Sequence, residues 1–247
     1  MSDFLQGKTI VITGAARRVG AHVARTLHAH GANIVVHYRG SDGDAQTLRA
    51  DLERARAGSV ALAQADLVDT AALAHIAHTA IERFGRIDAL INNASSFYPT
   101  PVAKASERDW DELIGSNLKG PFFLAQACAP HLRASRGCIV NIVDIYGERP
   151  LKLHPIYSMA KAGLIMMTKS LARELAPEVR VNAIAPGTIL WPERELGDEL
   201  KTSIIERTPQ RRSGSPDDIA RTMLFLIRDA DYITGQSYNV DGGLVGS

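Results

Sequence analysis

Tyr157 and Lys161 are the two side chains whose types and spacing point most directly to chemistry. They stand four residues apart in a segment where Pro155 opens a helical pattern, so both are predicted to face the same side of a helix. A phenol has an ordinary pKa of about 10, and a neighbouring ammonium favours the phenolate. The pair therefore predicts a proton donor or acceptor that works near neutral pH. The same spacing also occurs by chance on solvated helix faces.

A glycine-containing turn near the start of the chain indicates a nucleotide site. Residues 8–12 (KTIVI) predict a strand, residues 13–20 (TGAARRVG) a turn, residues 21–29 a helix, and residues 32–37 a second strand. Gly14 permits a tight turn and close approach of a ligand, while Gly20 permits close packing of helix on strand. The helix N-terminus suits a pyrophosphate. At the spacing of a βαβ unit, dinucleotide binding is favoured over an ordinary turn.

The end of the second predicted strand favours NADPH over NADH. It reads His37-Tyr38-Arg39-Gly40-Ser41 and has no acidic residue before Asp42, whereas NAD-selective folds place an acid there to bind the ribose 2′-hydroxyl. Arg17, Arg18 and Arg39 suit a 2′-phosphate, because a guanidinium binds phosphate through charge-assisted hydrogen bonds. The alternative is that Arg17 and Arg39 are solvated surface arginines.

An ordered set of segments resembles the short-chain dehydrogenase/reductase family along essentially the whole chain. The segments are Thr13-Gly14 to Gly20, Asp66-Leu67, Asn92-Asn93-Ala94, Asn117, Tyr157-Ser158-Met159-Ala160-Lys161, Val181-Asn182, Pro186-Gly187 and Asp241-Gly242-Gly243. The resemblance implies that Tyr157 is the catalytic proton donor, that Lys161 lowers its pKa and holds the nicotinamide ribose, and that Asn117 supports a proton-relay water. A satisfied buried amide is the other interpretation of Asn117.

The turn, the strand end and the family segments together predict the cofactor contacts. These are Gly14, Arg17, Arg18, Val19, Gly20, His37, Tyr38, Arg39, Ser41, Asp66, Leu67, Asn93, Ala94, Ser95, Tyr157, Lys161, Pro186, Gly187 and Ile189.

Two positions depart from the commonest pattern of the family. Arg18 stands where most members have a third glycine, and Asp144 stands where most have a serine, thirteen residues before Tyr157. The serine hydroxyl suits carbonyl reduction, because it donates to an oxygen on which negative charge develops. An ionised aspartate repels such charge and favours positive character on the substrate, as when a ring C=N accepts a proton on nitrogen and a hydride on carbon. Asp144 therefore predicts a catalytic role in imine reduction.

At these positions the chain is most similar to the pteridine reductase branch of the family. The matching stretches are TGAARRVG (13–20), HYRGS (37–41), QADL (64–67), NNASSFYPTP (92–101), Asp144 with Tyr157 and Lys161, and PGTILWPE (186–193). The similarity implies a pterin ring stacked between the nicotinamide and Phe97, with polar contacts from Arg18, Ser95, Asp144 and Tyr157. Selection of the pterin side chain is expected from residues 189–192, which include Leu190 and Trp191. An ordinary aromatic turn is the other interpretation of residues 97–99.

We therefore predict an NADPH-dependent reductase of dihydropterins, with oxidised pterins and dihydrofolate as further candidate substrates. One alternative is a carbonyl reductase of a 3-oxoacyl thioester, steroid or sugar, which the missing serine and Phe97 argue against. The other is a noncatalytic NADP(H)-binding sensor or interaction protein, which the intact Tyr157, Lys161 and Asn117 argue against.

The length of 247 residues and the alternation of patterns predict one α/β domain over residues 1–247. Further strands are predicted at residues 59–64, 89–92, 138–143, 179–184 and 237–240, with helices ending at Phe84, starting at Ser106, and covering residues 112–132, 155–176 and 216–226. This count predicts a Rossmann-type, doubly wound, seven-stranded parallel sheet with helices on both faces. Residues 187–208 predict a short helical lid over the substrate, or else a mobile surface loop.

Composition restricts the partners. With 28 basic and 27 acidic residues, the chain has no excess charge for nucleic acid or an acidic membrane. Cys128 and Cys138 are expected to be reduced, and His75 and His78 are expected on a solvated helix face without a metal. No apolar run is long enough for a leader or a membrane span, so a cytoplasmic location is expected. The resemblance implies a homotetramer that buries faces of the helices at 112–132 and 155–176.

Overall fold

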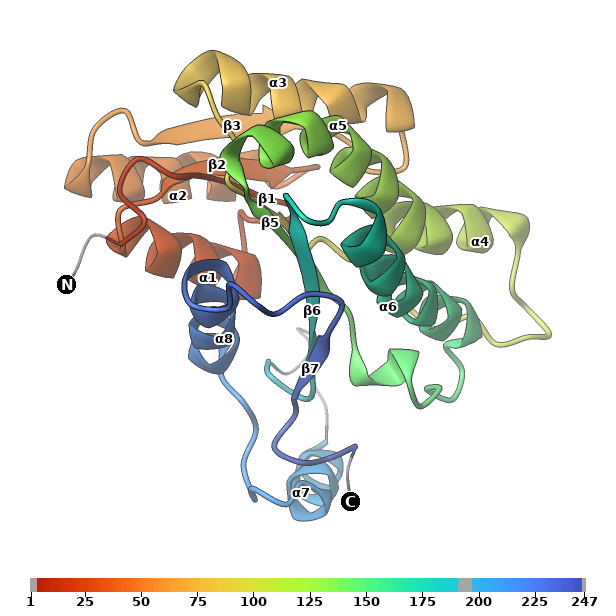
Figure 1. The fold of residues 1–247 in the computed structure, drawn as a ribbon. Helices are drawn as coiled ribbons and strands as arrows, with labels where there is room; N and C mark the ends of the chain where they lie inside the picture. Colours follow the sequence, from red (N-terminus) through yellow and green to blue (C-terminus); the bar gives the residue numbers. More distant parts are fainter. Residues whose placement is uncertain (1–3, 191–196, 246–247) are drawn as a thin grey trace.

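Seven parallel strands form one sheet in the computed structural model, which describes residues 4–190 and 197–245 (Figure 1). The strand order is β3-β2-β1-β4-β5-β6-β7. The strands are β1 (Thr9–Ile12), β2 (Asn33–Tyr38), β3 (Val60–Gln64), β4 (Ala89–Asn92), β5 (Cys138–Ile142), β6 (Arg180–Pro186) and β7 (Ser237–Val240). The predicted Rossmann-type sheet is confirmed, and its strand order reverses between β1 and β4.

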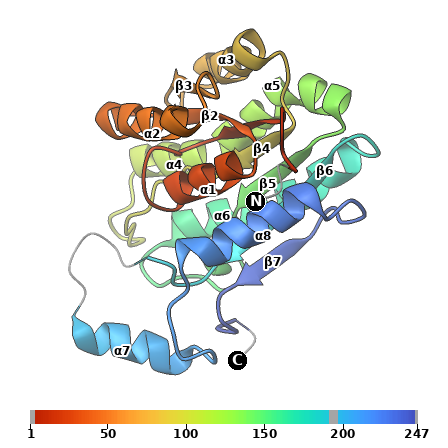
Figure 2. The same cartoon turned by 90° about the vertical axis from the view of Figure 1, so that its left-hand side faces the viewer.

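Helices cover both faces of this sheet (Figures 1 and 2). One face carries α1 (Arg18–Ala29), α2 (Asp42–Ala55) and α8 (Pro216–Arg228), and the other carries α3 (Leu73–Phe84), α4 (Glu107–Ile114), α5 (Gly120–Ser135) and α6 (Pro155–Glu174). Both views show α7 (Asp198–Arg207) standing apart from the sheet, near the C-terminus.

The central strands read as continuous apolar runs because both of their faces are buried. Every residue of β1 is buried. Ile10 and Ile12 pack into the core formed with α1 and α8, whereas Val11 between them packs into the core formed with α3 and α5. The alternation of side chains along one strand thus joins the two cores.

Two helical features differ from the sequence prediction. Helix α2 is absent from the sequence prediction, because only Ala45, Leu48 and Leu52 are buried and most of its other residues are polar. The predicted helix over residues 112–132 is interrupted by a π-helical segment, Gly115–Lys119, which separates α4 from α5. A Cβ on Gly120 would lie 2.5 Å from the carbonyl oxygen of Leu67, so this helix runs against the loop after β3 at a distance that only glycine permits.

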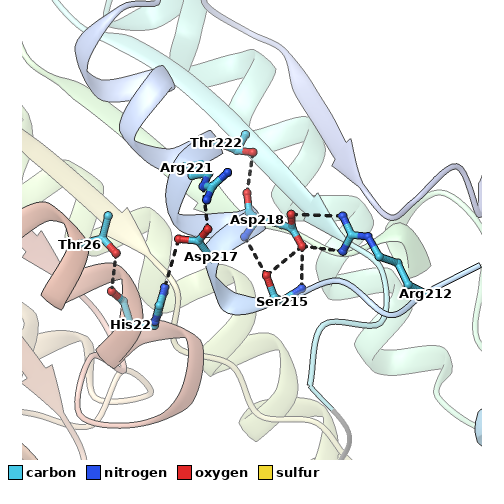
Figure 3. A network of polar contacts seen from close by, with 8 residues as sticks. All are labelled: His22, Thr26, Arg212, Ser215, Asp217, Asp218, Arg221 and Thr222. Carbon is cyan, nitrogen blue, oxygen red and sulfur yellow. Dashed lines mark hydrogen bonds and ion pairs between the residues drawn. The ribbon is translucent and has the colours of Figure 1, made fainter. Parts of the chain in front are cut away.

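Polar contacts tie α8 to α1 and to the segment that follows α7 (Figure 3). Ser215 caps α8 by accepting a hydrogen bond from the N–H of Asp218 at 3.3 Å, and the Asp218 carboxylate accepts from the N–H of Ser215 at 2.8 Å. Arg212 pairs with Asp218 at 3.0 Å, and Asp217 lies 3.7 Å from His22 of α1. These contacts hold Arg212 and Ser215 against α8, and α8 against α1, whose first residues line the cavity described below.

The described helices do not include one that is long and apolar enough to cross a membrane. His75 is exposed on α3, and His78 pairs with Glu82 at 2.9 Å. Within residues 4–190 and 197–245, no three histidine, cysteine or acidic side chains gather as ligands for a metal ion. Cys128 and Cys138 are both buried and free.

Candidate active site

A cavity of about 370 Å³ opens at the carboxyl ends of β1 and β4, where the strand order reverses. Its walls are Gly14, Arg17, Arg18, Val19, Gly20, His37, Arg39, Asp66, Leu67, Asn93, Ala94, Ser95, Ser96 and Ser116. Sequence reasoning missed Ser96 and Ser116. Ser96 directly follows the predicted Asn-Asn-Ala-Ser run and Ser116 directly precedes Asn117, so extending each segment by one residue would have found both.

The turn after β1 forms a close-fitting cradle. Gly14 has a φ of 60°, and a Cβ added there would lie 2.9 Å from the Cα of Ala94. A Cβ on Gly20 would lie 2.3 Å from the carbonyl oxygen of Gly14. The Asn93 amide donates to the carbonyl oxygens of Thr13 and Gly14, at 2.8 and 3.1 Å, and so braces the turn from β4. Since the first turn of α1 has no acidic side chain, this cradle fits a pyrophosphate group.

Arg18 adopts a backbone conformation that favours glycine. Its φ of 52° lies in the left-handed region, which costs a residue with a Cβ about 1–2 kcal/mol. Arg18 is one of the residues that line the cavity. The chain thus keeps a residue with an unfavourable backbone conformation in the wall of the cavity.

Arg39 places a second guanidinium at the cavity, at the end of β2. Its side chain is 58% exposed and lies 3.9 Å from the Asp66 carboxylate, a distance at which an exposed pair contributes little to stability. The neighbouring acid Asp42 is not among the residues that line the cavity, and its carboxylate accepts a hydrogen bond from the Tyr38 hydroxyl at 2.7 Å. Arg39 is therefore placed to bind an anion such as a ribose 2′-phosphate.

His37 borders the cavity, but both of its ring nitrogens are used inside the protein. Nδ1 accepts from the N–H of Gly14 at 3.2 Å, Nε2 donates to the carbonyl oxygen of Ala65 at 3.1 Å, and the His37 carbonyl accepts from the N–H of Ala15 at 2.9 Å. The residue is only 2% exposed, and burial lowers its pKa to about 4. His37 therefore positions the glycine turn as a neutral ring, and because it also lines the cavity, its predicted contact with a cofactor stays a prediction.

Tyr38 and Ser41 are not among the residues that line the cavity. The Tyr38 ring is buried and its hydroxyl is bound to Asp42, while Ser41 lies at the N-terminal end of α2. Pro186 pairs with Val240 of β7, and the N–H of Gly187 donates to the carbonyl oxygen of Val240 at 3.0 Å. The predicted cofactor contacts of Tyr38, Ser41, Pro186 and Gly187 therefore stay predictions, and the Tyr38 hydroxyl is already bound to Asp42.

Asp144 and Tyr157 meet directly. The Tyr157 hydroxyl donates to Oδ2 of Asp144 at 2.6 Å, and Oδ1 of the same carboxylate accepts from the N–H of Tyr146 at 2.9 Å. Lys161 Nζ donates to the carbonyl oxygen of Ile142 at 2.9 Å and lies 5.6 Å from the centroid of the Tyr157 ring. Tyr157 and Lys161 thus lie at the predicted helical spacing in α6. Asp144 lies two residues after the end of β5, beside them.

The three groups perturb one another. Burial and the negative charge of Asp144 raise the pKa of Tyr157 well above its ordinary value. Burial lowers the pKa of Lys161 to about 8 and raises the pKa of Asp144. This direction is opposite to the predicted lowering of the Tyr157 pKa by Lys161, because burial of the phenol and the carboxylate bound to it both raise the pKa. Tyr157 is a phenol that keeps its proton and shares it with Asp144.

Asn117 lies in the π-helical segment and is fully buried. Its Nδ2 donates to the carbonyl oxygens of Ser96 and Leu113, both at 3.0 Å, and its Oδ1 accepts from the Ser95 hydroxyl at 2.6 Å. Ser95 also neighbours the Tyr157 hydroxyl. The buried amide is thus satisfied and ties Ser95 and Ser96 of the cavity wall to the π-helical segment, while its predicted support of a relay water stays a prediction.

Phe97 lies next to this group. Its ring is 4.8 Å from the Tyr157 ring, edge to face, and is 46% exposed. Leu190 is also exposed, whereas Ile189 is buried against Gly214. Trp191 lies outside the described residues, and α7 falls within the predicted lid segment at residues 187–208. A half-exposed aromatic face beside a shared proton can hold and protonate a flat ring.

Comparison with known proteins places these features in a wide group of enzymes. The family described as Enoyl-(Acyl carrier protein) reductase matches residues 14–245. A 3-oxoacyl-[acyl-carrier-protein] reductase FabG from Staphylococcus epidermidis is 36% identical over 241 residues, which cover 96% of this chain and 98% of that protein. The protein of the same name from Thermotoga maritima is 34% identical over 247 residues, covering 98% and 99%. A crystal structure from Brucella melitensis, titled Short-chain dehydrogenase/reductase SDR:Glucose/ribitol dehydrogenase, superposes with a TM-score of 0.89 at 30% identity and 99% coverage of both chains.

Proposed function

The chain belongs to the short-chain dehydrogenase/reductase family of oxidoreductases, and from this premise we propose that it is an NADPH-dependent reductase of dihydropterins. The observation that carries the proposal is the hydrogen bond of 2.6 Å between the Tyr157 hydroxyl and the Asp144 carboxylate. A carboxylate at this point disfavours an oxyanion and favours a substrate that becomes positively charged as it accepts a proton. A ring C=N is such a substrate.

The residues of the cavity fit NADPH. The cradle of Gly14 and Gly20 leaves room that a Cβ would fill, and Arg39 supplies a cation for the 2′-phosphate. NADPH, when bound, supplies the hydride. Lys161 is buried beside Tyr157 and, with a pKa of about 8, keeps its positive charge at neutral pH.

The chain's own residues supply the proton. Because its pKa is raised, Tyr157 holds its proton at neutral pH and donates a hydrogen bond to Asp144. When a hydride adds to the ring carbon, the ring nitrogen takes a proton from this pair: the O–H bond of Tyr157 breaks, Asp144 relays the proton, and the phenolate that remains lies near the Lys161 ammonium. Water returns the proton to Tyr157 after the product leaves. Phe97 offers the adjacent aromatic face on which a flat heterocycle gains from stacking.

A second candidate is favoured by the names of the relatives. The matched proteins from Staphylococcus and Thermotoga are called 3-oxoacyl-[acyl-carrier-protein] reductases, and these names support the carbonyl-reductase alternative better than the pterin substrate. On this alternative, Tyr157 protonates a ketone oxygen. The carboxylate of Asp144 would then lie beside developing negative charge, which is why we rank this candidate second on geometry.

The two candidates are separated by one assay. NADPH oxidation by the purified protein is followed with dihydrobiopterin and, in parallel, with a 3-oxoacyl thioester such as acetoacetyl-CoA. We expect kcat/KM to be higher for dihydrobiopterin than for the 3-oxoacyl thioester. Turnover of the thioester alone would establish the second candidate, and no oxidation with either compound, despite NADPH binding, would favour a noncatalytic binding protein.

We also propose that the chain assembles as a homotetramer through α5 and α6. Phe122, Phe123 and Met166 are exposed on these helices and line one shallow apolar cavity with Gly163. Exposed large apolar side chains that gather in this way are typical of interaction surfaces. Light scattering coupled to size-exclusion chromatography tests the assembly, and Phe123→Glu is expected to dissociate it.

A further inference from the structure

The ring of Phe97 is backed by the imidazole of His154. The two ring centroids are 4.7 Å apart and the planes differ by 8°, so the rings are stacked in parallel. His154 is only 7% exposed, whereas Phe97 is 46% exposed. One face of Phe97 is therefore covered by the imidazole, and its exposure comes from the remainder of the ring. The second contact of Phe97, edge to face with Tyr157 at 4.8 Å, fixes the stack beside the proton donor.

The chain around His154 is arranged to hold this stack. Leu153 has a φ of 66°, a left-handed conformation that is strained for leucine, and its carbonyl oxygen accepts from the N–H of Thr100 at 2.7 Å. His154 is the residue that precedes α6, and its carbonyl accepts from the N–H of Ser158 at 3.0 Å. The aromatic segment 97–100 is thus bound to the start of the helix that carries Tyr157. Strain of this kind persists where the surrounding structure holds a particular geometry.

The two nitrogen atoms of the imidazole also indicate that His154 does more than fill space beside Phe97. Nδ1 donates to the carbonyl oxygen of Lys152 at 2.9 Å, which fixes the orientation of the ring. Nε2 has no hydrogen-bond partner among the residues that the structure describes, although it is buried. A buried nitrogen without a partner is destabilising, and an aliphatic side chain would fill the same space without that cost. The planar ring is therefore kept for its shape against Phe97.

We propose that His154 is a positioning residue for the substrate ring. A flat heterocycle that stacks on the exposed part of the Phe97 ring forms the outer layer of a stack whose inner layer is His154, and the edge-to-face contact between Phe97 and Tyr157 sets the distance from the proton donor. The inference rests on the proposed function, because it assigns the aromatic platform to a flat substrate. It predicts that His154 affects substrate binding much more than cofactor binding.

The test compares His154→Leu with His154→Phe. The leucine removes the planar ring, and an aromatic pair is worth about 0.5–1.5 kcal/mol, so KM for dihydrobiopterin should rise roughly 2- to 13-fold. Phenylalanine restores the stack without the imidazole nitrogens, and its KM should return to within about twofold of wild type. The Kd for NADPH, measured by fluorescence titration, should be unchanged in both. His75→Leu, a substitution of an exposed histidine on α3, serves as the matched control.

Substrate-free crystal structures of wild type and His154→Leu complete the test, because they report the Phe97 ring without any assumption about the substrate. We expect the ring to leave its wild-type orientation in the leucine variant. An unmoved ring, or a KM that is unchanged in His154→Leu, would overturn the positioning role, as would equal impairment of the leucine and phenylalanine variants. If wild type does not reduce dihydropterin, the proposed function fails on its own, and the crystal structures still decide whether His154 positions Phe97.

Discussion

The cofactor side and the substrate side of the site are built by different means. On the cofactor side, the glycine cradle and the buried ring of His37 fix main-chain atoms, and the fit depends on the absence of side chains at Gly14 and Gly20. On the substrate side, the geometry is set by contacts between side chains, such as Asp144 with Tyr157 and Phe97 with His154. Members of a large family that share this fold can therefore differ in substrate through a few side chains while the cofactor site stays the same.

The difference extends to charge. The cofactor side presents the guanidinium of Arg39 to an anion, whereas the substrate side buries a carboxylate against a phenol. Burial raises the pKa of Asp144. Burial and the charge of Asp144 raise the pKa of Tyr157, so Tyr157 keeps its proton at neutral pH. Substitutions on the two sides should consequently change different quantities: affinity for the cofactor on one side, and turnover of the substrate on the other.

Tyr157→Phe should give the largest effect, and it should lower substrate turnover without changing cofactor affinity. Loss of a general acid typically lowers turnover by about 10²- to 10⁴-fold. The Kd for NADPH should stay within about twofold, since the phenylalanine ring fills the same space. Steady-state kinetics and fluorescence titration measure the two quantities. Unaltered turnover with intact cofactor binding would remove Tyr157 from the proton path.

The pH dependence of stability tests the cofactor side through His37. Its folded-state pKa of about 4 lies below the ordinary 6.5, so the unfolded chain binds the proton more readily. The stability that the neutral ring contributes is complete above about pH 6.5 and is lost as the pH falls toward 4, by about 3 kcal/mol in total. Urea unfolding at several pH values should show a weaker dependence over this range in His37→Gln than in wild type. Identical pH profiles would show that His37 does not carry this linkage.

Arg39→Ala should give a smaller effect, confined to one cofactor. A charge-assisted hydrogen bond contributes about 1.5–3 kcal/mol, so the Kd for NADPH should rise by roughly 13- to 160-fold while the Kd for NADH changes little. Arg25→Ala provides the control, because Arg25 lies on α1 and pairs with Asp51 at 2.9 Å. An equal loss of affinity for both cofactors would place Arg39 at the adenine or in the fold.

The sequence predicted the sheet and the glycine turn because these depend on local rules. Buried parallel strands read as apolar runs, and a turn that excludes Cβ atoms requires glycine, so β1, β4 and Gly14 could be found without neighbours. Helix α2 was missed because its buried face consists of three residues in an otherwise polar segment.

The orientation of individual side chains could not be predicted in the same way. His37 lines the cavity, but the sequence does not reveal that its two ring nitrogens are bound to Gly14 and Ala65, which lie far away in the sequence. The stack of His154 on Phe97 joins segments 57 residues apart, and no periodicity in either segment signals it. The pKa of Tyr157 depends on its burial and on the carboxylate that accepts its hydrogen bond, and only the three-dimensional structure shows both.

The most direct test of the substrate chemistry is the kinetics of Asp144→Ser, with Asp144→Asn as the variant that keeps the size and removes the charge. Serine is the neutral donor that suits an oxyanion, and a melting temperature checks that the fold survives. We predict that kcat/KM for dihydrobiopterin falls by about tenfold or more in both variants, while activity on acetoacetyl-CoA holds or rises in the serine variant. Unchanged reduction of dihydrobiopterin, with loss of activity on the ketone, would contradict the assignment of Asp144 to imine reduction.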